Sequence, residues 1–272
     1  MHRILLTALA VGLAATTSHA ETFRIPDRDA AALVAAIEKA ESTREPDRIE
    51  LAPDGLYVFR SASDRDRALA LPYVRTAITI VGNGAEIRRY SDQEFALVGV
   101  ASTGKLALEN IGLAEAGRGA IVNRGVLHLD RVRVTDSTAD GANAIVTNYG
   151  TLRGADSEIS FNAVLAAQRD AGILVNYGRL ELARSRMAGN TVTGRRGSVM
   201  TASAMLNLGD ASFRDVKIEG NSAVAEPIDT TRAHAVVNVG NGALHGEGIQ
   251  LVGNFPEEAN ALPAQDPDSM AP

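Results

Sequence analysis

Eight polar and charged residues in the C-terminal half combine side-chain types that could bind or cleave an acidic sugar. They lie in three segments that follow Asn162, Asn190 and Asn221, and these segments lengthen along the chain. Arginine can clamp a carboxylate, while aspartate and histidine can serve as acid and base. The members of this predicted binding edge are Gln168, Arg169, Asp170, Arg195, Arg196, Asp229, Arg232 and His234. Loops on a rigid scaffold often carry recognition, so any function should lie here. Solvated insertions without a function are the simpler interpretation, and the sequence assigns no catalytic residue.

The residue patterns that hold metal ions are missing from the sequence. The chain has no cysteine, no HExxH motif and no paired CxxC motif. His128 and His245 fall in repeats four coils apart, too far to share a metal ion. Neither the adjacent aspartates of a polygalacturonase nor a calcium-binding carboxylate cluster is found. We therefore expect no metal and no cofactor.

Charged residues also recur on the exposed side of the predicted strands. One series, of alternating sign, is Arg131, Asp156, Arg184 and Asp215. A second, with a carboxylate between cations, is Arg133, Glu158, Arg186 and Lys217. Regularly spaced arginines could bind an acidic polysaccharide. Because each cation has a carboxylate neighbour about 4.8 Å away in the next coil, we favour a mutually neutralised ladder that fixes register.

A repeat that begins with glycine places all these residues. It starts at Gly104, Gly125, Gly150, Gly178, Gly209 and Gly242. Positions two and four after the glycine are mostly apolar and alternate with polar residues, which indicates a strand buried on one face. Positions seven and nine continue the alternation after a turn near positions five and six, and a third strand such as AIVN precedes the glycine. Three strands per repeat with no helix between them predict an all-β fold, a single parallel β-helix whose coils stack to bury their apolar faces.

Asparagines recur at two corners of the predicted coil. One row precedes the glycine by two residues, at Asn123, Asn148, Asn176 and Asn207, and Asn238 ends the same kind of strand. A second row follows the glycine by twelve residues, at Asn162, Asn190, Asn221 and Asn254. Stacked amides can hydrogen-bond along the stack, so we predict two asparagine ladders rather than sugar-binding residues.

The N-terminal region carries two signals of its own. Residues 1–20 contain one early cation, an apolar run and a Ser-His-Ala end, which predict a secretory signal peptide cleaved after Ala20. In residues 29–41, Leu33, Val34 and Ile37 have helical spacing, and we expect a helix that caps the N-terminal end of the stack.

The C-terminal residues lack any apolar periodicity. Residues 255–272 are rich in proline and acidic side chains and should form a flexible tail. The β-helix domain is accordingly assigned to residues 21–254. Its C-terminal end has no evident cap, so we expect either the tail to lie across the last coil or a second copy of the chain to dock there by self-association.

The charge balance excludes some partners. The formal net charge is −6, which argues against nucleic acid and against an anionic membrane surface. Apart from the leader, no segment is apolar and long enough to span a bilayer. We expect a secreted or periplasmic protein whose partner is a polysaccharide or another cell-surface ligand.

The repeat text resembles a known class of proteins. GAIVNRGVLHLDRVRVTDSTA and AIVTNYGTLRGADSEISFNA are similar to repeats of the secreted right-handed β-helix proteins of the pectin-lyase-like superfamily, above all the adhesin and autotransporter-passenger type. The resemblance covers roughly residues 27–254. It implies a right-handed coil, an extracellular location and frequent involvement with polysaccharides or host surfaces, while many such proteins have no catalytic activity.

These observations favour a surface-binding or structural solenoid of unassigned molecular role, with carbohydrate recognition as its expected activity. The alternative is a polysaccharide lyase or glycoside hydrolase that acts on an acidic polysaccharide at the long-loop edge. Whether the protein is an enzyme is left open by the sequence, which leans toward binding.

Overall fold

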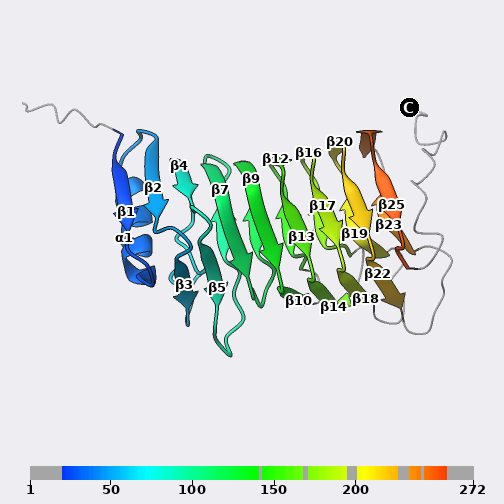
Figure 1. Ribbon diagram of the computed structural model, residues 1–272, viewed down its shortest axis with the longest axis horizontal. Helices are drawn as coiled ribbons and strands as arrows, with labels where there is room; N and C mark the ends of the chain where they lie inside the picture. The colour runs from blue at the N-terminus through cyan, green and yellow to red at the C-terminus, as the bar shows by residue number, and fades with distance from the viewer. Residues whose placement is uncertain are drawn as a thin grey trace, which may run out of the picture.

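Strands of successive repeats lie side by side and parallel, so the chain forms a parallel β-solenoid of about seven turns (Figure 1). The computed structural model describes residues 20–140, 143–167, 171–194, 201–225, 233–239 and 242–255. The predicted signal peptide up to residue 19 and the predicted tail from residue 256 lie outside these residues. The predicted fold class is confirmed, and the right-handed sense of the coil stays a prediction.

The longest row of strands includes the segments that directly follow the repeat glycines. Its pairs are parallel and in register, so that Leu152 pairs with Leu127 on one side and with Leu180 on the other. In order, the row contains β1 (Thr22–Ile25), β2 (Asp47–Leu51), β4 (Ala77–Val81), β7 (Lys105–Ala114), β9 (Val126–Thr135), β12 (Thr151–Ala155), β16 (Arg179–Ala183), β20 (Asp210–Arg214) and β24 (Ala243–Glu247).

The same sheet bends into a second row of shorter strands. β7 and β9 pass through both rows, whereas later repeats break between them. The other members of the second row are β3 (Leu56–Phe59), β5 (Glu86–Arg89), β13 (Glu158–Ser160), β17 (Arg186–Ala188), β21 (Lys217–Glu219) and β25 (Gln250–Val252).

Two further sheets complete the coil. A full coil thus has four strands, one more than the three strands per repeat that the sequence predicts. The expected strands before the glycines form the sheet of β6 (Val98–Val100), β8 (Ile121–Asn123), β11 (Val146–Asn148), β15 (Leu174–Asn176), β19 (Thr201–Asn207) and β23 (Ala233–Asn238). The additional sheet contains β10 (Thr138–Asp140), β14 (Ala163–Ala167), β18 (Thr191–Gly194) and β22 (Ser222–Ala225). This sheet lies at the start of the segments that the sequence predicts to be loops of increasing length. Its strands bury side chains at equivalent positions, namely Ala139, Val164, Val192 and Ala223.

Two corners of each coil use left-handed backbone. The turn expected near position six is made by residues with φ of 47 to 55° in five successive coils and by Gly248 in the sixth; the five are Asn110, Arg131, Asp156, Arg184 and Asp215. At position eleven, Glu115, Asp136 and Phe161 are likewise left-handed, and Gly189, Gly220 and Gly253 follow in the later coils. Asparagine and aspartate tolerate this conformation better than other residues with side chains, whereas Arg131 and Arg184 have no such preference, so at these two arginines the geometry is imposed by stacking.

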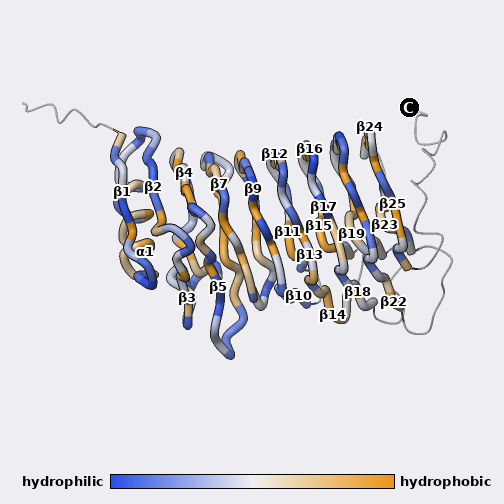
Figure 2. The backbone as a smooth tube through the Cα atoms, viewed as in Figure 1, coloured by the Kyte–Doolittle hydropathy of each residue, from blue (hydrophilic) through white to orange (hydrophobic). Residues whose placement is uncertain are grey.

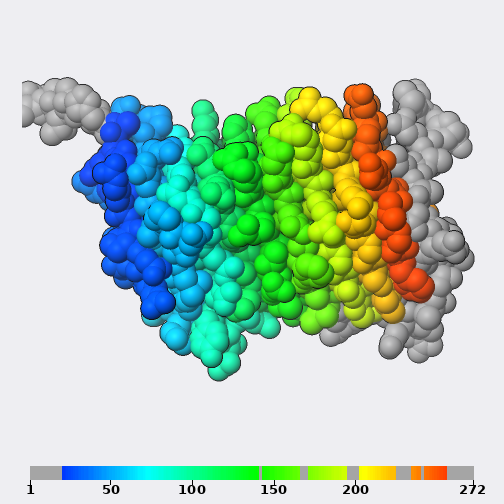
Figure 3. Space-filling view, viewed as in Figure 1, coloured from blue at the N-terminus to red at the C-terminus, as the bar shows by residue number. Residues whose placement is uncertain are grey.

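The interior of the solenoid is an apolar column that runs along the stack. Inward positions such as Leu108, Leu127, Leu180 and Ile218 are fully or almost fully buried. Figure 2 shows the resulting alternation of hydrophobic and hydrophilic residues along the strands. Each coil covers its neighbours, as the bands of successive colour in Figure 3 show.

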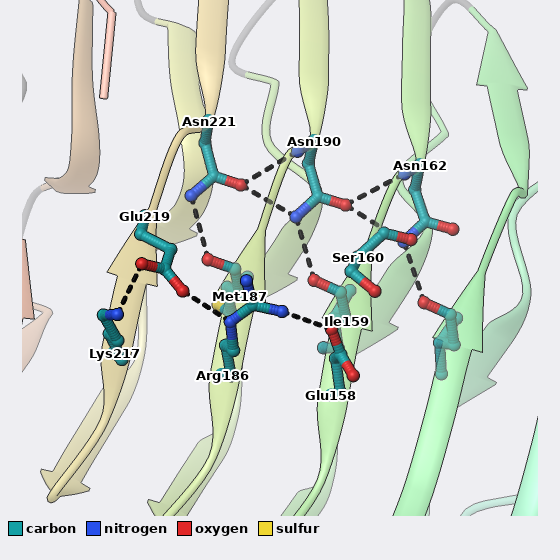
Figure 4. Close-up of polar contacts among 11 residues, drawn as sticks. Glu158, Ile159, Ser160, Asn162, Arg186, Met187, Asn190, Lys217, Glu219 and Asn221 are labelled. Carbon is teal, nitrogen blue, oxygen red and sulfur yellow. Dashed lines mark hydrogen bonds and ion pairs between the residues drawn. The ribbon is translucent and has the colours of Figure 1, made fainter. Parts of the chain in front are cut away.

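Both predicted asparagine ladders are present. In the first, the Nδ2 atoms of Asn123, Asn148, Asn176 and Asn207 each donate to the Oδ1 of the next asparagine at 2.7 Å. In the second, Asn162, Asn190 and Asn221 donate in the same way at 2.8 to 3.0 Å (Figure 4). These side chains are buried, so the interpretation as turn structure rather than sugar contacts is confirmed.

The predicted N-terminal helix is also confirmed. α1 spans Ala30–Ala40, and the Asp29 side chain caps it by accepting a hydrogen bond from the Ala32 amide at 2.8 Å. Leu33 and Ile37 are completely buried in the core at this end of the stack (Figure 1). Sequence analysis missed β1, which precedes the helix and pairs with β2.

The last coil is less covered than the coils before it. Ala211 and Phe213 of β20 are buried, whereas their register partners in β24, Leu244 and Gly246, are half-buried and exposed. Among the described residues no coil follows β24 and β25, and the prediction that this end lacks a cap is untested because residues 256–272 lie outside them. Self-association through it stays a prediction.

Candidate functional site

Seven of the eight residues of the predicted binding edge lie outside the described residues: Gln168, Arg169, Asp170, Arg195, Arg196, Asp229 and Arg232. The eighth, His234, lies in β23 and is the register partner of Ala202 in β19. Its Nδ1 atom is buried and has no hydrogen-bond partner in the described part of the chain. The histidine is therefore placed on a strand, while its relation to the other seven residues is untested.

A groove instead lies on the outer face of the longest sheet row. It has a volume of about 620 Å³ and crosses β9, β12, β16 and β20. Outward residues at position three of these strands stand in register, in the order His128, Arg153, Glu181 and Ser212. Asp130, Arg179 and Arg214 complete its polar lining.

Glu181 holds two arginines of the groove. Its Oε2 accepts from Arg153 Nε at 2.9 Å across the coils, and its Oε1 accepts from Arg179 Nε at 2.7 Å within β16. Arg153 and then Arg179 hold the pKa of the Glu181 carboxyl below its ordinary value, against the opposing effect of burial. Glu181 is therefore a carboxylate and not an acid at neutral pH.

Both guanidinium groups keep their terminal nitrogens for other partners. In the described part of the structure, Arg153 and Arg179 each bond through Nε alone. The Nη1 and Nη2 atoms are the pair that meets a planar anion in a two-pronged contact. Glu181 thus fixes two such groups on neighbouring strands, which lie about 4.8 Å apart.

The groove is locally cationic although the chain is acidic. Asp130 is already paired with Arg131, which does not line the groove, at 2.7 Å. Among the described residues, the Arg214 side chain has no ion-pair partner and the His128 imidazole makes no hydrogen bond. The groove therefore has three arginines, and Glu181 is the carboxylate of its lining that is not paired with a residue outside the groove. The site is suited to an anion rather than to a cation.

The predicted charge ladder occupies the neighbouring strands and is largely neutralised. Arg186 pairs with Glu158 and with Glu219, each at 2.6 Å, and Lys217 pairs with Glu219 at 2.5 Å (Figure 4). Lys217 and then Arg186 keep the pKa of Glu219 below its ordinary value.

The turn residues of the first charge series pair only in part. Arg184 makes a two-pronged contact with Asp156, at 2.8 and 2.6 Å, which lowers the pKa of that carboxyl. Arg131 pairs with Asp130 of its own coil instead of with Asp156. The predicted pairing of opposite charges between coils is thus confirmed for Arg184 with Asp156 and for Arg186 with Glu158, whereas a role of these pairs in fixing the register stays a prediction.

A row of aromatic residues, which the sequence analysis missed, follows the first asparagine ladder. Tyr149 and Tyr177 stack with centroids 4.9 Å apart and an interplanar angle of 6°. Arg124 of the preceding coil lies over the Tyr149 ring at 4.5 Å. Both faces of Tyr149 are therefore used within the protein, and the repeated Asn-Tyr-Gly of consecutive coils is the signal that could have predicted the stack.

No metal centre is found in the described ranges, where no three His, Cys, Asp or Glu side chains gather to hold an ion. Among the same residues, no helix has the length and apolar character needed to cross a membrane. Comparisons with protein families, with curated proteins and with solved structures found no match. What the chain shows is thus a parallel β-solenoid with asparagine ladders.

Proposed function

We propose that the protein is a non-catalytic binding solenoid that recognises an acidic polysaccharide along the groove over β9, β12, β16 and β20. The ligand class is a polymer that carries a carboxylate or sulfate on successive sugars. The proposal moves the expected recognition from the long-loop edge to the regular face of the sheet.

The observation that supports this function best is the arrangement of Arg153, Arg179 and Glu181. Glu181 uses one oxygen for the Nε atom of each arginine, and both pairs of terminal nitrogens are left for a ligand. Because the strands beneath are paired in register, little conformational freedom is lost on binding. Arg214 supplies a third positive charge at the same groove.

The local charge also favours an anionic polymer. Anions are drawn to a cationic groove even when the whole chain is acidic, because exposed charges are screened beyond about 8 Å at physiological ionic strength. The outward cations on β13, β17 and β21 are less available to an anionic ligand, since Arg186 and Lys217 are already paired with carboxylates.

The side chains of the groove are poorly suited to sugar hydrolysis. A glycosidase needs a carboxylic acid and a second carboxylate across the bond that is cleaved. Here the low pKa of Glu181 opposes protonation, and Asp130 is paired with Arg131. The alternative lyase or hydrolase at the long-loop edge depends on seven residues outside the described ranges and stays a prediction.

A binding screen tests the proposed ligand class. Purified protein is run in affinity gels that contain polygalacturonate, alginate, a sulfated dextran or neutral dextran. We expect retardation by the anionic polymers that weakens with added salt, and none by neutral dextran. Equal retardation by neutral dextran, or none by any polymer, would contradict the proposal.

A further inference from the structure

Asp47 is a buried carboxylate without a cation in the described part of the structure. It begins β2, and only 3% of its surface is exposed. Its Oδ1 accepts from the backbone nitrogen of Glu21 at 2.7 Å, and its Oδ2 accepts from the Thr43 hydroxyl at 3.0 Å. Neutral donors compensate a buried carboxylate only in part, because the charge itself loses its hydration.

The atom that faces Asp47 is the nitrogen of the peptide bond after Ala20. This is the bond at which the sequence predicts removal of the leader. Ala20 and Glu21 are both exposed, whereas Asp47 on the other side of the contact is not. The Glu21 carbonyl also accepts from the Arg48 amide at 2.9 Å, so Glu21 is already held beside β2.

We propose that cleavage after Ala20 creates the missing cation, and that the new α-ammonium group of Glu21 forms an ion pair with Asp47 that fixes the first strand. A leader peptidase would hydrolyse the Ala20–Glu21 bond with one water molecule. The hydroxyl goes to the Ala20 carbonyl carbon and the proton to the Glu21 nitrogen, which takes up a second proton from solvent. The neutral amide donor thereby becomes a charged donor at the same position.

This inference rests on the predicted leader and is independent of the proposed ligand. It gives Asp47 a role after processing, because the Glu21 nitrogen that would become the free N-terminus is the atom that contacts the buried carboxylate. Asp27 is a suitable control, because its Oδ1 also accepts from a backbone amide, that of Leu56 at 2.8 Å, but its side chain is half exposed.

The first test is the N-terminus of the full chain expressed with its leader in a secreting bacterial host. Intact mass and N-terminal sequencing should give Glu21 as the first residue. Processing at any other bond would overturn the proposal.

The second test separates the charge from the hydrogen bond. Gly-Ser inserted between Ala20 and Glu21 keeps the Glu21 amide as a donor and moves the ammonium away. In the mature insertion variant, the Arg48 amide should exchange hydrogen about tenfold faster, because a charge-assisted bond is replaced by a neutral one. The Thr191 amide, which donates to Asn162 in a distant coil at 2.9 Å, should keep its rate and serves as the internal reference.

The third test asks whether the effect of the insertion on the Arg48 amide depends on Asp47. In Asp47→Asn the insertion should add no further acceleration, whereas in the control Asp27→Asn it should act as in the wild type. An insertion without effect on the Arg48 amide, or one that acts equally in Asp47→Asn, would show that Asp47 is only a structural acceptor. If Asp47→Asn fails to fold, the insertion in the wild-type chain still decides between the two.

Discussion

Asn190 illustrates how a single side chain holds three coils together. Its Oδ1 accepts from the backbone nitrogen and from Nδ2 of Asn162, both at 3.0 Å. Its Nδ2 donates to Asn221 Oδ1 at 2.8 Å and to the Ile159 carbonyl at 2.9 Å. Asn190 is completely buried. The ladder therefore satisfies backbone groups that the turn would otherwise leave unpaired.

Asn190→Ala should destabilise the fold strongly. The Asn162 amide and the Ile159 carbonyl would each lose a buried partner, and each unsatisfied group costs about 1–3 kcal/mol. Urea denaturation should show a loss of about 2–5 kcal/mol in the free energy of unfolding. The control is Asn143→Ala, since the Asn143 side chain makes, within the described part of the chain, a single exposed hydrogen bond, to the Asp140 carbonyl. Equal losses in the two variants would contradict the ladder's role.

The Glu181 carboxyl should titrate below its ordinary pKa of 4.5. A depressed pKa in the folded state means that its stabilising effect is complete above pH 4.5 and is lost as pH falls through the folded value. Carbon-detected NMR of the side chain should give a midpoint below 4.5 in the wild type and a higher one in Arg153→Ala. A wild-type midpoint at or above 4.5 would show that the arginines do not hold this carboxylate.

At the scale of the strand and turn, the repeat glycine is explained by close approach. A Cβ atom at Gly150, Gly178 or Gly209 would lie under 3.0 Å from the backbone oxygen of the equivalent glycine one coil before. None of these three has a positive φ. The first position of each repeat thus excludes side chains because neighbouring coils touch there.

Gly178→Ala and Gly220→Ala separate the two reasons for a glycine. Gly220 has a φ of 60° and open space around its Cα, so alanine there should cost only about 1–2 kcal/mol of backbone strain. Gly178→Ala should cost about 3 kcal/mol, because the new methyl group meets rigid backbone of the preceding coil. Thermal denaturation compares the two, and a larger loss in Gly220→Ala would contradict this account.

The elements predicted from sequence are those that burial dictates. Leu180 and Leu182 alternate with polar residues because one face is enclosed, and that alternation is visible in the chain. The sheet β10-β14-β18-β22 was missed because its short strands do not share a regular alternation of apolar and polar residues. In β14, whose residues are AVLAA, Val164 is buried while Leu165 is exposed. The turn near position six was predicted, but its left-handed conformation was not, because Arg131 carries no local signal for that conformation; the same holds for Phe161 at position eleven.

The groove over β9, β12, β16 and β20 was also missed, and the reason differs from that for the missed strands. Arg153 and Glu181 stand at the same repeat position, three residues after Gly150 and Gly178. Arg179 stands at another position and belongs to the site only through its bond to Glu181. Such a site depends on exact register between coils, which residue spacing does not reveal. His234 was predicted as a loop residue of the binding edge and lies on β23.

For the whole molecule, the proposed function implies that the residues that stabilise the stack differ from those that would bind the ligand. Core leucines and asparagine ladders hold the coils, and paired charges cover β13, β17 and β21. Over β9, β12, β16 and β20 the same in-register stacking leaves arginines with unused donors. The solenoid would therefore act as a rigid support for one cationic groove on an acidic surface.

Calorimetric affinity for a uronate oligomer tests this central claim most directly. It is measured for the wild type, for Arg153→Ala/Arg179→Ala, and for Arg184→Ala/Arg186→Ala, which removes the same charge from the neighbouring ladder. We predict that the groove variant binds at least about tenfold more weakly, because each arginine loses a charge-assisted contact, while the ladder variant stays within about twofold of the wild type. Equal weakening in both variants would mean that binding follows net charge alone, and unchanged affinity in the groove variant would place the ligand elsewhere.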